Sequence, residues 1–276
     1  DNMKIALCLH GYFGTVSTGD FTTAAGGYEH IQGRVYSKVD NVDVFVHCWQ
    51  PEFEEQIEKL YKPKQSVYEE QIDFDKVCKE NGIDQDYIDE GFPREQTFYK
   101  NAVASRILSF YYSRCQSLKL ALEGDYDWII TTRFDIAQRG GLEVNRIRFF
   151  PDSVRDCLYT TYWDQMNQGY GDMWFYGSPS IMKKYSSIYD RALDDFKPRS
   201  GYEAMVVGAE GGIPDSQFYN WYDTKDYRQF SNELIKPEEQ RSKTLMLLPR
   251  WRVSDSHLYH KWFCMQNELY NKTRWV

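Results

Sequence analysis

Long apolar runs are missing from this 276-residue chain. No stretch approaches the roughly 20 consecutive apolar residues that a membrane-spanning helix requires. No charged segment followed by an apolar one precedes the first predicted strand, as it would in a signal peptide. We therefore expect no membrane span and a location in the cytoplasm.

The cysteines form neither of the patterns that would give them a structural role. The chain contains 6 cysteines, and no two of them make a C-x-x-C pair. This spacing excludes the disulfide framework of a small secreted domain and gives no zinc cluster. We expect free, mostly buried thiols in a reducing compartment. The cysteines are Cys8, Cys48, Cys78, Cys115, Cys157 and Cys264.

Two glycine-rich phosphate-binding motifs are absent from the loop that follows the first predicted strand. Gly11–Asp20 contains neither G-x-x-x-x-G-K-[ST] nor G-x-G-x-x-G, which disfavours P-loop kinases and dinucleotide-dependent enzymes.

The chain has no excess of basic residues, since 33 Lys and Arg against 41 Asp and Glu give a net charge of −8. Duplex affinity comes mainly from basic side chains that neutralise phosphates, so we expect no nucleic-acid partner.

Aromatic residues, in contrast, are abundant. The chain has 22 Tyr, 16 Phe and 8 Trp, together 17% of its residues. Such rings pack in cores and also bind flat ligands such as bases and sugar faces. No linker rich in Pro or Ser divides the sequence, so we expect a single domain over residues 1–276.

Short apolar runs that stop at loops predict the strands of a sheet. They are Met3–Leu9, Val42–Cys48, Trp128–Thr132, Leu158–Tyr162, Met173–Tyr176 and Leu245–Leu248, with Ser66–Phe74 as a strand or extended segment.

Helical patterns alternate with these runs. Arg106 and Arg114 lie on the longest predicted helix, where we expect solvent rather than phosphate around them. The alternation predicts an α/β sandwich with a mostly parallel central sheet flanked by helices. The predicted helices are Phe53–Tyr61, Val103–Leu122, Pro179–Leu193 and Pro214–Tyr222, with a loop over Lys76–Glu95 and an aromatic tail from Ser254 onward.

The run Trp128–Thr132 leads directly into Arg133-Phe134-Asp135. Open α/β sheets bind ligands at the carboxyl ends of their strands. Asp135 is suited to hold Mg²⁺ or Mn²⁺ together with substrate phosphates. Arg133 lies on the same face of an extended chain and is suited to a phosphate or a sugar hydroxyl. The alternative is a structural ion pair between Arg133 and Asp135.

Tyr126–Ile136, taken with the order of the segments around it, resembles nucleotide-sugar glycosyltransferases of the GT-A fold, which is a Rossmann-like sandwich. In those enzymes a D-x-D motif after the central strand binds the metal and the nucleotide sugar. Arg133-Phe134-Asp135 is an R-x-D variant, so the role of the first Asp is lost or taken by Arg133. Gly171–Ser178 and Gly211–Phe218 extend the resemblance to most of the chain.

The resemblance implies a role for each half of the domain. Residues 1–135 would bind the nucleotide sugar, and residues 136–276 would hold the acceptor and include the C-terminal tail. The nucleotide pocket would lie at the end of the first strand, where Tyr12 or Phe13 is suited to stack on a base. Its residues would be His10, Gly11, Tyr12, Phe13 and Gly14, with Arg133.

The resemblance also implies that His257 completes the metal shell beside Asp135. The alternative is a packed or surface histidine, and no further pattern supports a zinc site.

An inverting transfer needs a carboxylate to accept the proton of the acceptor hydroxyl. Asp215 and Asp172 are the candidates. Their alternatives are an acid at a helix start for Asp215 and a turn residue for Asp172. Inverting and retaining chemistry both stay open. The aromatic residues between Tyr159 and Tyr176 flank the expected acceptor side, and we expect fewer than half of them to contact ligand.

The leading hypothesis is a metal-dependent hexosyltransferase that uses Mn²⁺ or Mg²⁺ and a nucleoside-diphosphate sugar, by resemblance a UDP-sugar. Its acceptor would be a glycan. By the same resemblance it would serve polysaccharide biosynthesis, or glycan synthesis in the host cytoplasm if the source is viral. The alternatives are a non-catalytic carbohydrate-binding protein on the same fold and a sugar nucleotidyltransferase.

Overall fold

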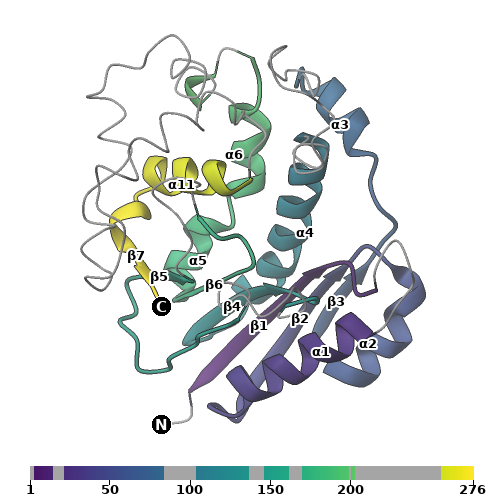
Figure 1. Ribbon diagram of the computed structural model, residues 1–276, viewed down its shortest axis with the longest axis vertical. Helices are drawn as coiled ribbons and strands as arrows, with labels where there is room; N and C mark the ends of the chain where they lie inside the picture. Colours follow the sequence, from purple (N-terminus) through teal and green to yellow (C-terminus); the bar gives the residue numbers. More distant parts are fainter. Residues whose placement is uncertain are drawn as a thin grey trace.

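The computed structural model describes residues 3–14, 22–83, 104–136, 146–161, 170–198, 200–202 and 256–276. These residues form a seven-stranded sheet in the order β3-β2-β1-β4-β6-β5-β7 (Figure 1). The strands are β1 Lys4–Gly11, β2 Asn41–Cys48, β3 Gln65–Tyr68, β4 Trp128–Arg133, β5 Leu158–Thr160, β6 Trp174–Gly177 and β7 Thr273–Trp275.

The sheet is mixed but mostly parallel. β1 pairs in parallel with β2 and with β4, β2 pairs in parallel with β3, and β5 pairs in parallel with β7. β6 is antiparallel to both of its neighbours, β4 and β5. The expected α/β sandwich with a mostly parallel sheet is therefore confirmed, with β6 as the exception.

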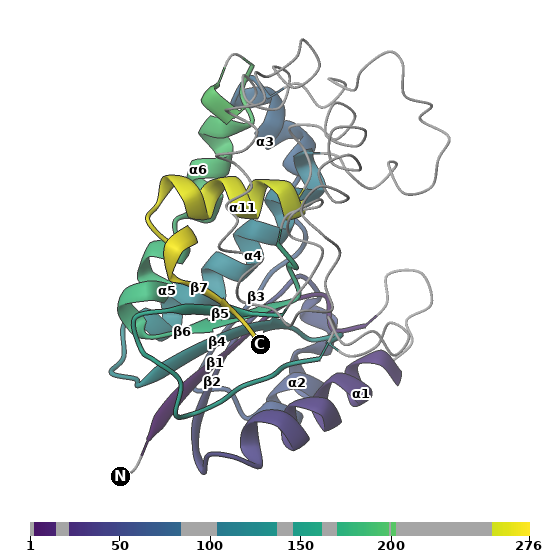
Figure 2. The ribbon, with the colours of Figure 1, turned by 60° about the vertical axis from the view of Figure 1, so that its left-hand side comes forward.

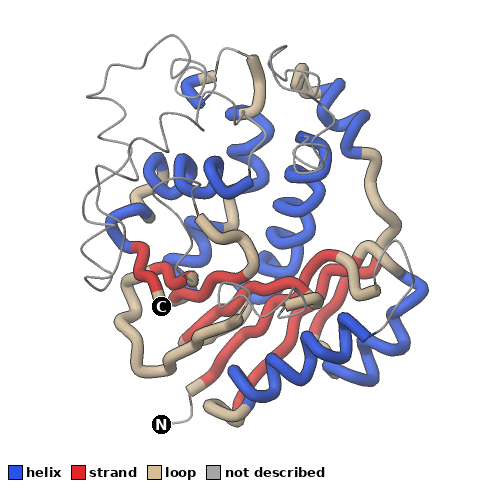
Figure 3. Tube along the Cα trace, viewed as in Figure 1, coloured by secondary structure: helices blue, strands red, loops and turns tan. Residues whose placement is uncertain are grey.

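Helices cover both faces of the sheet, as Figures 1 and 2 show. One face carries α1 and α2, and the other carries α4, α5, α6 and α11, with α3 packed against α4. The tube view in Figure 3 shows the same layers. The helices are α1 Thr22–Ile31, α2 Glu54–Tyr61, α3 Phe74–Glu80, α4 Ala104–Leu122, α5 Pro179–Tyr185, α6 Ile188–Asp195 and α11 Ser256–Gln266.

The central strands are mostly apolar because both faces of the sheet are buried, and their carboxyl ends carry polar residues such as His10 and Arg133. In β1, Ala6 and Cys8 join the core on the α4 side, whereas Ile5, Leu7 and Leu9 join the core on the α1 side. This alternation follows from the period of two in a strand.

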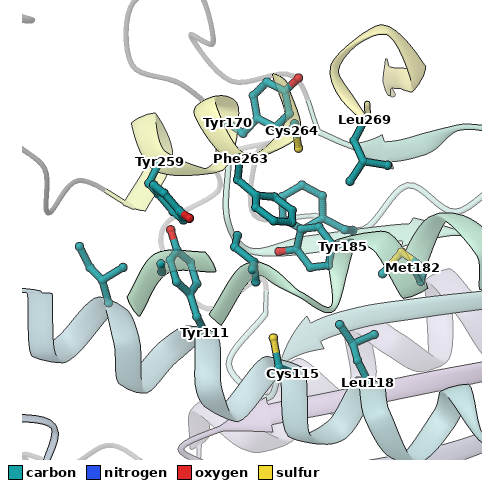
Figure 4. Packing of buried hydrophobic residues seen from close by; sticks show 14 of the residues in the cluster. Tyr111, Cys115, Leu118, Tyr170, Met182, Tyr185, Tyr259, Phe263, Cys264 and Leu269 are labelled. Carbon is teal, nitrogen blue, oxygen red and sulfur yellow. The ribbon is translucent and has the colours of Figure 1, made fainter. Parts of the chain in front are cut away.

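The longest helix, α4, packs against β1, β2 and β4 through an apolar stripe. Leu108, Tyr111, Cys115 and Leu118 of this stripe are buried at helical spacing. Figure 4 shows Tyr111 turned toward Tyr259, with other side chains of α5 and α11 beside it. The helix expected over Val103–Leu122 is thus observed from Ala104 onward.

Two sequence expectations need correction. The stretch predicted as a loop from Lys76 includes most of α3, because the Asp73 side chain accepts a hydrogen bond from Lys76 N at 3.0 Å and caps a helix that buries Phe74 and Cys78. The helix expected over Pro179–Leu193 is two helices, α5 and α6, separated at Ser186 and Ser187.

The C-terminal tail, expected only as an aromatic segment, forms regular elements. It contains α11, a 3₁₀ turn over Tyr270–Lys272 and β7, which pairs with β5. The helix expected over Pro214–Tyr222 and the strand expected over Leu245–Leu248 lie outside the described residues.

The six cysteines are free and buried, as predicted. Among the helices of the described residues, none has the length and apolar character needed to cross a membrane.

Leu118→Ala tests the packing of α4 against the sheet. Leu118 is fully buried, so the substitution is expected to lower the free energy of unfolding by about 2–5 kcal/mol through lost apolar contact and a cavity. Lys119→Ala, at the next and exposed position, is the control and should change it by less than about 0.5 kcal/mol. Urea unfolding measures both, and equal effects would contradict the assigned helix face.

Candidate functional site

The strand order places a topological switch point between β1 and β4. From β1 the sheet continues through β2 and β3 on one side, while β4 lies on the other side of β1. In open α/β sheets, ligands bind in the crevice outside the carboxyl ends of the strands at such a point. His10 pairs with Arg133 in the register of β1 and β4. The two segments singled out in the sequence therefore meet at this edge.

α1 approaches the end of β4 closely. A Cβ atom on Gly27 would lie 1.9 Å from the carbonyl oxygen of Phe134, so only glycine permits this contact. This close contact holds the Arg133–Asp135 segment against α1.

Arg133 and Asp135 form a bidentate ion pair. Arg133 Nε donates to Asp135 Oδ1 at 2.7 Å, and Nη2 donates to Oδ2 at 2.6 Å. Burial alone would lower the pKa of Arg133, but the charges of Asp135 and Asp172 raise it, so the guanidinium stays charged. The ion pair that the sequence left open as an alternative is the arrangement in the structure.

The expected metal ligands do not form a metal site in this arrangement. Both oxygens of Asp135 are bonded to Arg133, and His257 Nδ1 donates to the carbonyl oxygen of Tyr170 at 2.8 Å. Over the described ranges, no group of three or more His, Cys, Asp and Glu side chains is arranged to hold a metal ion. The side chains in the described ranges therefore do not fit Mn²⁺ or Mg²⁺.

Arg114 is fully buried, which corrects the expectation that it faces solvent. Its Nε donates to His10 Nε2 at 3.0 Å and its Nη1 to the hydroxyl of Tyr185 at 2.8 Å. Nη2 donates to the carbonyl oxygens of Asp172 and Met173. Helical spacing could have found this residue, because position 114 lies on the same stripe as the buried residues of α4.

His10 is a neutral hydrogen-bond donor at the end of β1. Since Nε2 accepts from Arg114, the ring proton is on Nδ1, a buried atom that has no partner among the residues the structure describes. Burial, followed by the nearby charges of Arg114 and Arg133, holds the pKa of His10 well below its usual value. A buried donor without an acceptor is a feature of functional sites.

Asp172 lies just before β6 and faces the start of α11. Its Oδ2 accepts from Ser256 Oγ at 2.9 Å and lies 3.8 Å from His257 Nδ1. Burial would raise the pKa of Asp172, but His257 first, and then His260 and the two arginines, lower it to about 2. A carboxylate with so low a pKa is a weak proton acceptor near neutral pH, so the geometry favours an electrostatic role for it.

The loop after β1 is held by side chains from two other elements. Gly11 N donates to Ser113 Oγ at 2.9 Å, while Phe13 N and Gly14 N both donate to Gln50 Oε1 at 2.8 Å. Phe13 is buried, with its ring against Phe53 and Phe134, so it is a core residue and no platform for a base. Tyr12 is 37% exposed and keeps that possibility.

The aromatic cluster around β5 and β6 belongs mainly to the core. Tyr159, Tyr170, Trp174, Phe175 and Tyr176 are all buried, as the packing interpretation predicted for most of the cluster. The other two members, Tyr162 and Trp163, and the candidate base Asp215 lie outside the described residues.

Comparison with models of protein families, with curated proteins and with solved structures finds no match to this chain. The observations of the structure and the sequence therefore carry the functional argument.

The pKa of Asp172 leads to a prediction about stability in acid. Because the folded-state pKa of about 2 lies below the ordinary value of 3.8, the carboxylate contributes about 2 kcal/mol above pH 4. This contribution is lost as the pH falls from about 4 through 2. Asp172→Asn should lower the free energy of unfolding by that amount at neutral pH.

Urea unfolding across this pH range measures the effect. The difference between wild type and Asp172→Asn should narrow in acid, whereas the exposed Asp125→Asn should differ little from wild type throughout. A difference that stays constant with pH would show that Asp172 is not selectively stabilised as the anion.

Proposed function

We propose that this chain is a glycosyltransferase of the GT-A type, which moves a sugar from a nucleoside-diphosphate sugar, by resemblance a UDP-sugar, to a glycan acceptor. The observation that carries the proposal is the meeting of His10 and Arg133 at the switch point between β1 and β4. The resemblance of Tyr126–Ile136 to these enzymes is the second support.

The groups at this edge match the parts of such a donor. Arg133 is partly exposed and carries a planar cation suited to phosphate oxygens. His10, in register with Arg133, is fully buried, and no described residue accepts from its Nδ1. The exposed ring of Tyr12, at the end of the neighbouring strand, is suited to a flat base. A ligand with a base and phosphates would contact the exposed parts of Tyr12 and Arg133.

The reaction determines what these groups would do. The bond between the sugar C1 and the diphosphate oxygen breaks, and a bond from C1 to the acceptor oxygen forms. The acceptor hydroxyl loses its proton, and negative charge develops on the leaving diphosphate. A fixed guanidinium beside the diphosphate would stabilise that charge in the transition state. The proton acceptor is the role left for Asp215, since the low pKa of Asp172 makes it a weak base.

A second candidate is a carbohydrate-binding or nucleotide-sugar-binding protein without turnover. Its support is the bidentate pair, because both oxygens of Asp135 are bonded to Arg133 and not to a catalytic partner.

The experiment is a thermal-shift panel of UDP, GDP, ADP, CMP and their sugars, each with and without Mn²⁺, followed by an assay of nucleotide release with glycan acceptors. A ligand that binds the folded state raises the unfolding midpoint. We expect a shift with UDP or a UDP-sugar and release of UDP when acceptor is added. Binding without release supports the second candidate, and the absence of any shift overturns the proposal. The arms with Mn²⁺ test the predicted metal.

Arg133→Ala is expected to weaken UDP binding on the order of tenfold to a hundredfold, because charge-assisted hydrogen bonds to phosphate are lost. The matched control is Arg155→Ala. Arg155 also pairs with an aspartate, Asp127. Asp127 precedes the amino end of β4, whereas Arg133 is at its carboxyl end. Isothermal titration calorimetry measures both, and equal affinities would remove Arg133 from the site.

Asp135→Asn separates the ion pair from a metal ligand. With Asp135 acting only as the partner of Arg133, the variant should keep its UDP affinity in metal-free buffer, since the guanidinium then has no competing carboxylate. The same titration with Mn²⁺ is the second arm. A loss of affinity confined to that arm would show that Asp135 binds the metal after all.

A further inference from the structure

A second chain of hydrogen bonds reaches the loop after β1 from the other side of the strand. Gly11 N lies 2.9 Å from Ser113 Oγ, which lies 2.7 Å from His47 Nδ1, and His47 Nε2 lies 2.7 Å from Glu69 Oε1. Ser113 comes from α4, His47 from β2, and Glu69 follows β3. Ser113 and His47 are fully buried, whereas the Glu69 side chain is 34% exposed.

Proton directions in this series of hydrogen bonds follow from the Glu69 end. The carboxylate of Glu69 only accepts, so His47 Nε2 carries a proton. Burial lowers the pKa of His47 although Glu69 raises it, so the ring is neutral and Nδ1 has no proton. Ser113 Oγ therefore donates to His47 Nδ1 and accepts from Gly11 N–H. His47 is therefore the Nε2–H tautomer, opposite to His10 beside it in the sheet.

Ser113, His47 and Glu69 have the spacing of a nucleophilic triad, but their surroundings exclude that role. Ser113 lies in the middle of α4, has no exposed surface, and uses its oxygen to accept from Gly11. An acyl group could not reach it without the loss of that packing.

The hydrogen bonds from Glu69 through His47 and Ser113 hold the backbone of the loop instead. Gly11 has φ +95°, a conformation that other residues rarely adopt. Its N–H donates to Ser113 Oγ, and its carbonyl oxygen accepts from Trp49 N at 3.2 Å. Gln50 Oε1 accepts from the N–H groups of Phe13 and Gly14. The backbone of the loop is thus fixed on both sides of Tyr12, which is 37% exposed and whose hydroxyl donates to Gln71 Oε1 at 2.5 Å.

We infer that Glu69, His47 and Ser113 are positioning residues for the nucleotide-binding loop, which they hold so that Tyr12 is in place for the base of the donor. The inference rests on the proposed function for the identity of the ligand, on the hydrogen bonds for the loop, and on the hydrogen bonds with the neutral His47 ring for the tautomer.

The first test compares Ser113→Ala with Ser117→Ala. Ser117 is the matched control, because it is one turn further along α4, is equally buried, and donates only to the carbonyl oxygen of Arg114 within its own helix. Ser113→Ala should weaken UDP binding by about tenfold, as expected for one buried hydrogen bond, while Ser117→Ala should bind like wild type. Equal affinities of the two folded variants would overturn the inference.

Substitution of the partly exposed Glu69 tests the same inference if Ser113→Ala fails to fold. Glu69→Gln retains an oxygen that can accept from His47 Nε2–H, whereas Glu69→Leu does not. Glu69→Leu should therefore weaken UDP binding more than Glu69→Gln, although a purely structural role would change only the unfolding midpoint. The same affinity for both variants would contradict the role assigned to Glu69.

Two measurements need no nucleotide and separate this inference from the proposed function. The ¹⁵N chemical shifts of His47 should report a protonated Nε2, and the Gly11 amide should exchange faster in Ser113→Ala than in Ser117→Ala. If wild type binds no UDP but both results hold, the proposed function fails and the positioning of the loop stands. A protonated Nδ1, unchanged exchange, or labelling of Ser113 by a fluorophosphonate would overturn the positioning role.

Discussion

The arrangement of the site depends on the buried guanidinium of Arg114. A cation removed from water is tolerated only when hydrogen bonds replace its hydration, and here the acceptors come from β1, from α5 and from the segment before β6. The rings of Phe110 and Phe175 lie 4.5 and 5.3 Å from its centre and add cation–π contact. Because one planar group satisfies all these partners, the three elements cannot shift independently.

The polar groups of the site are largely bonded to one another in this structure. Arg133 is held by Asp135, His10 Nε2 by Arg114, and Asp172 by Ser256. Such a network is rigid, and a ligand gains only the difference between its own contacts and those it replaces. His10 Nδ1 is the exception, since no described residue accepts from this buried donor. The network thus favours ligands with a strong acceptor, and phosphate is one.

Much of the fold could be predicted from the sequence, because apolar runs mark strands that are buried on both faces and helical spacing marks α4. The resemblance assigned His10 and Arg133 to one pocket, and the register of β1 and β4 places them side by side. Two parts were missed. Arg114 was assigned to solvent because a charge is rarely buried, although its spacing placed it on the core side. The partners of Ser113 and Asp135 depend on side-chain rotamers, which no local pattern specifies.

The pairing of β7 with β5 has a consequence for how the sheet is assembled. Leu158 lies beside Thr273, although the two are far apart along the chain, whereas β1, β2 and β3 come from neighbouring segments. Closing a long loop costs chain entropy before any contact repays it, so this pairing is expected to form late. Until β7 pairs with it, β5 has an unpaired edge that can pair with strands of other molecules. We therefore expect the risk of aggregation to be greatest after β5 is synthesised and before β7 pairs with it.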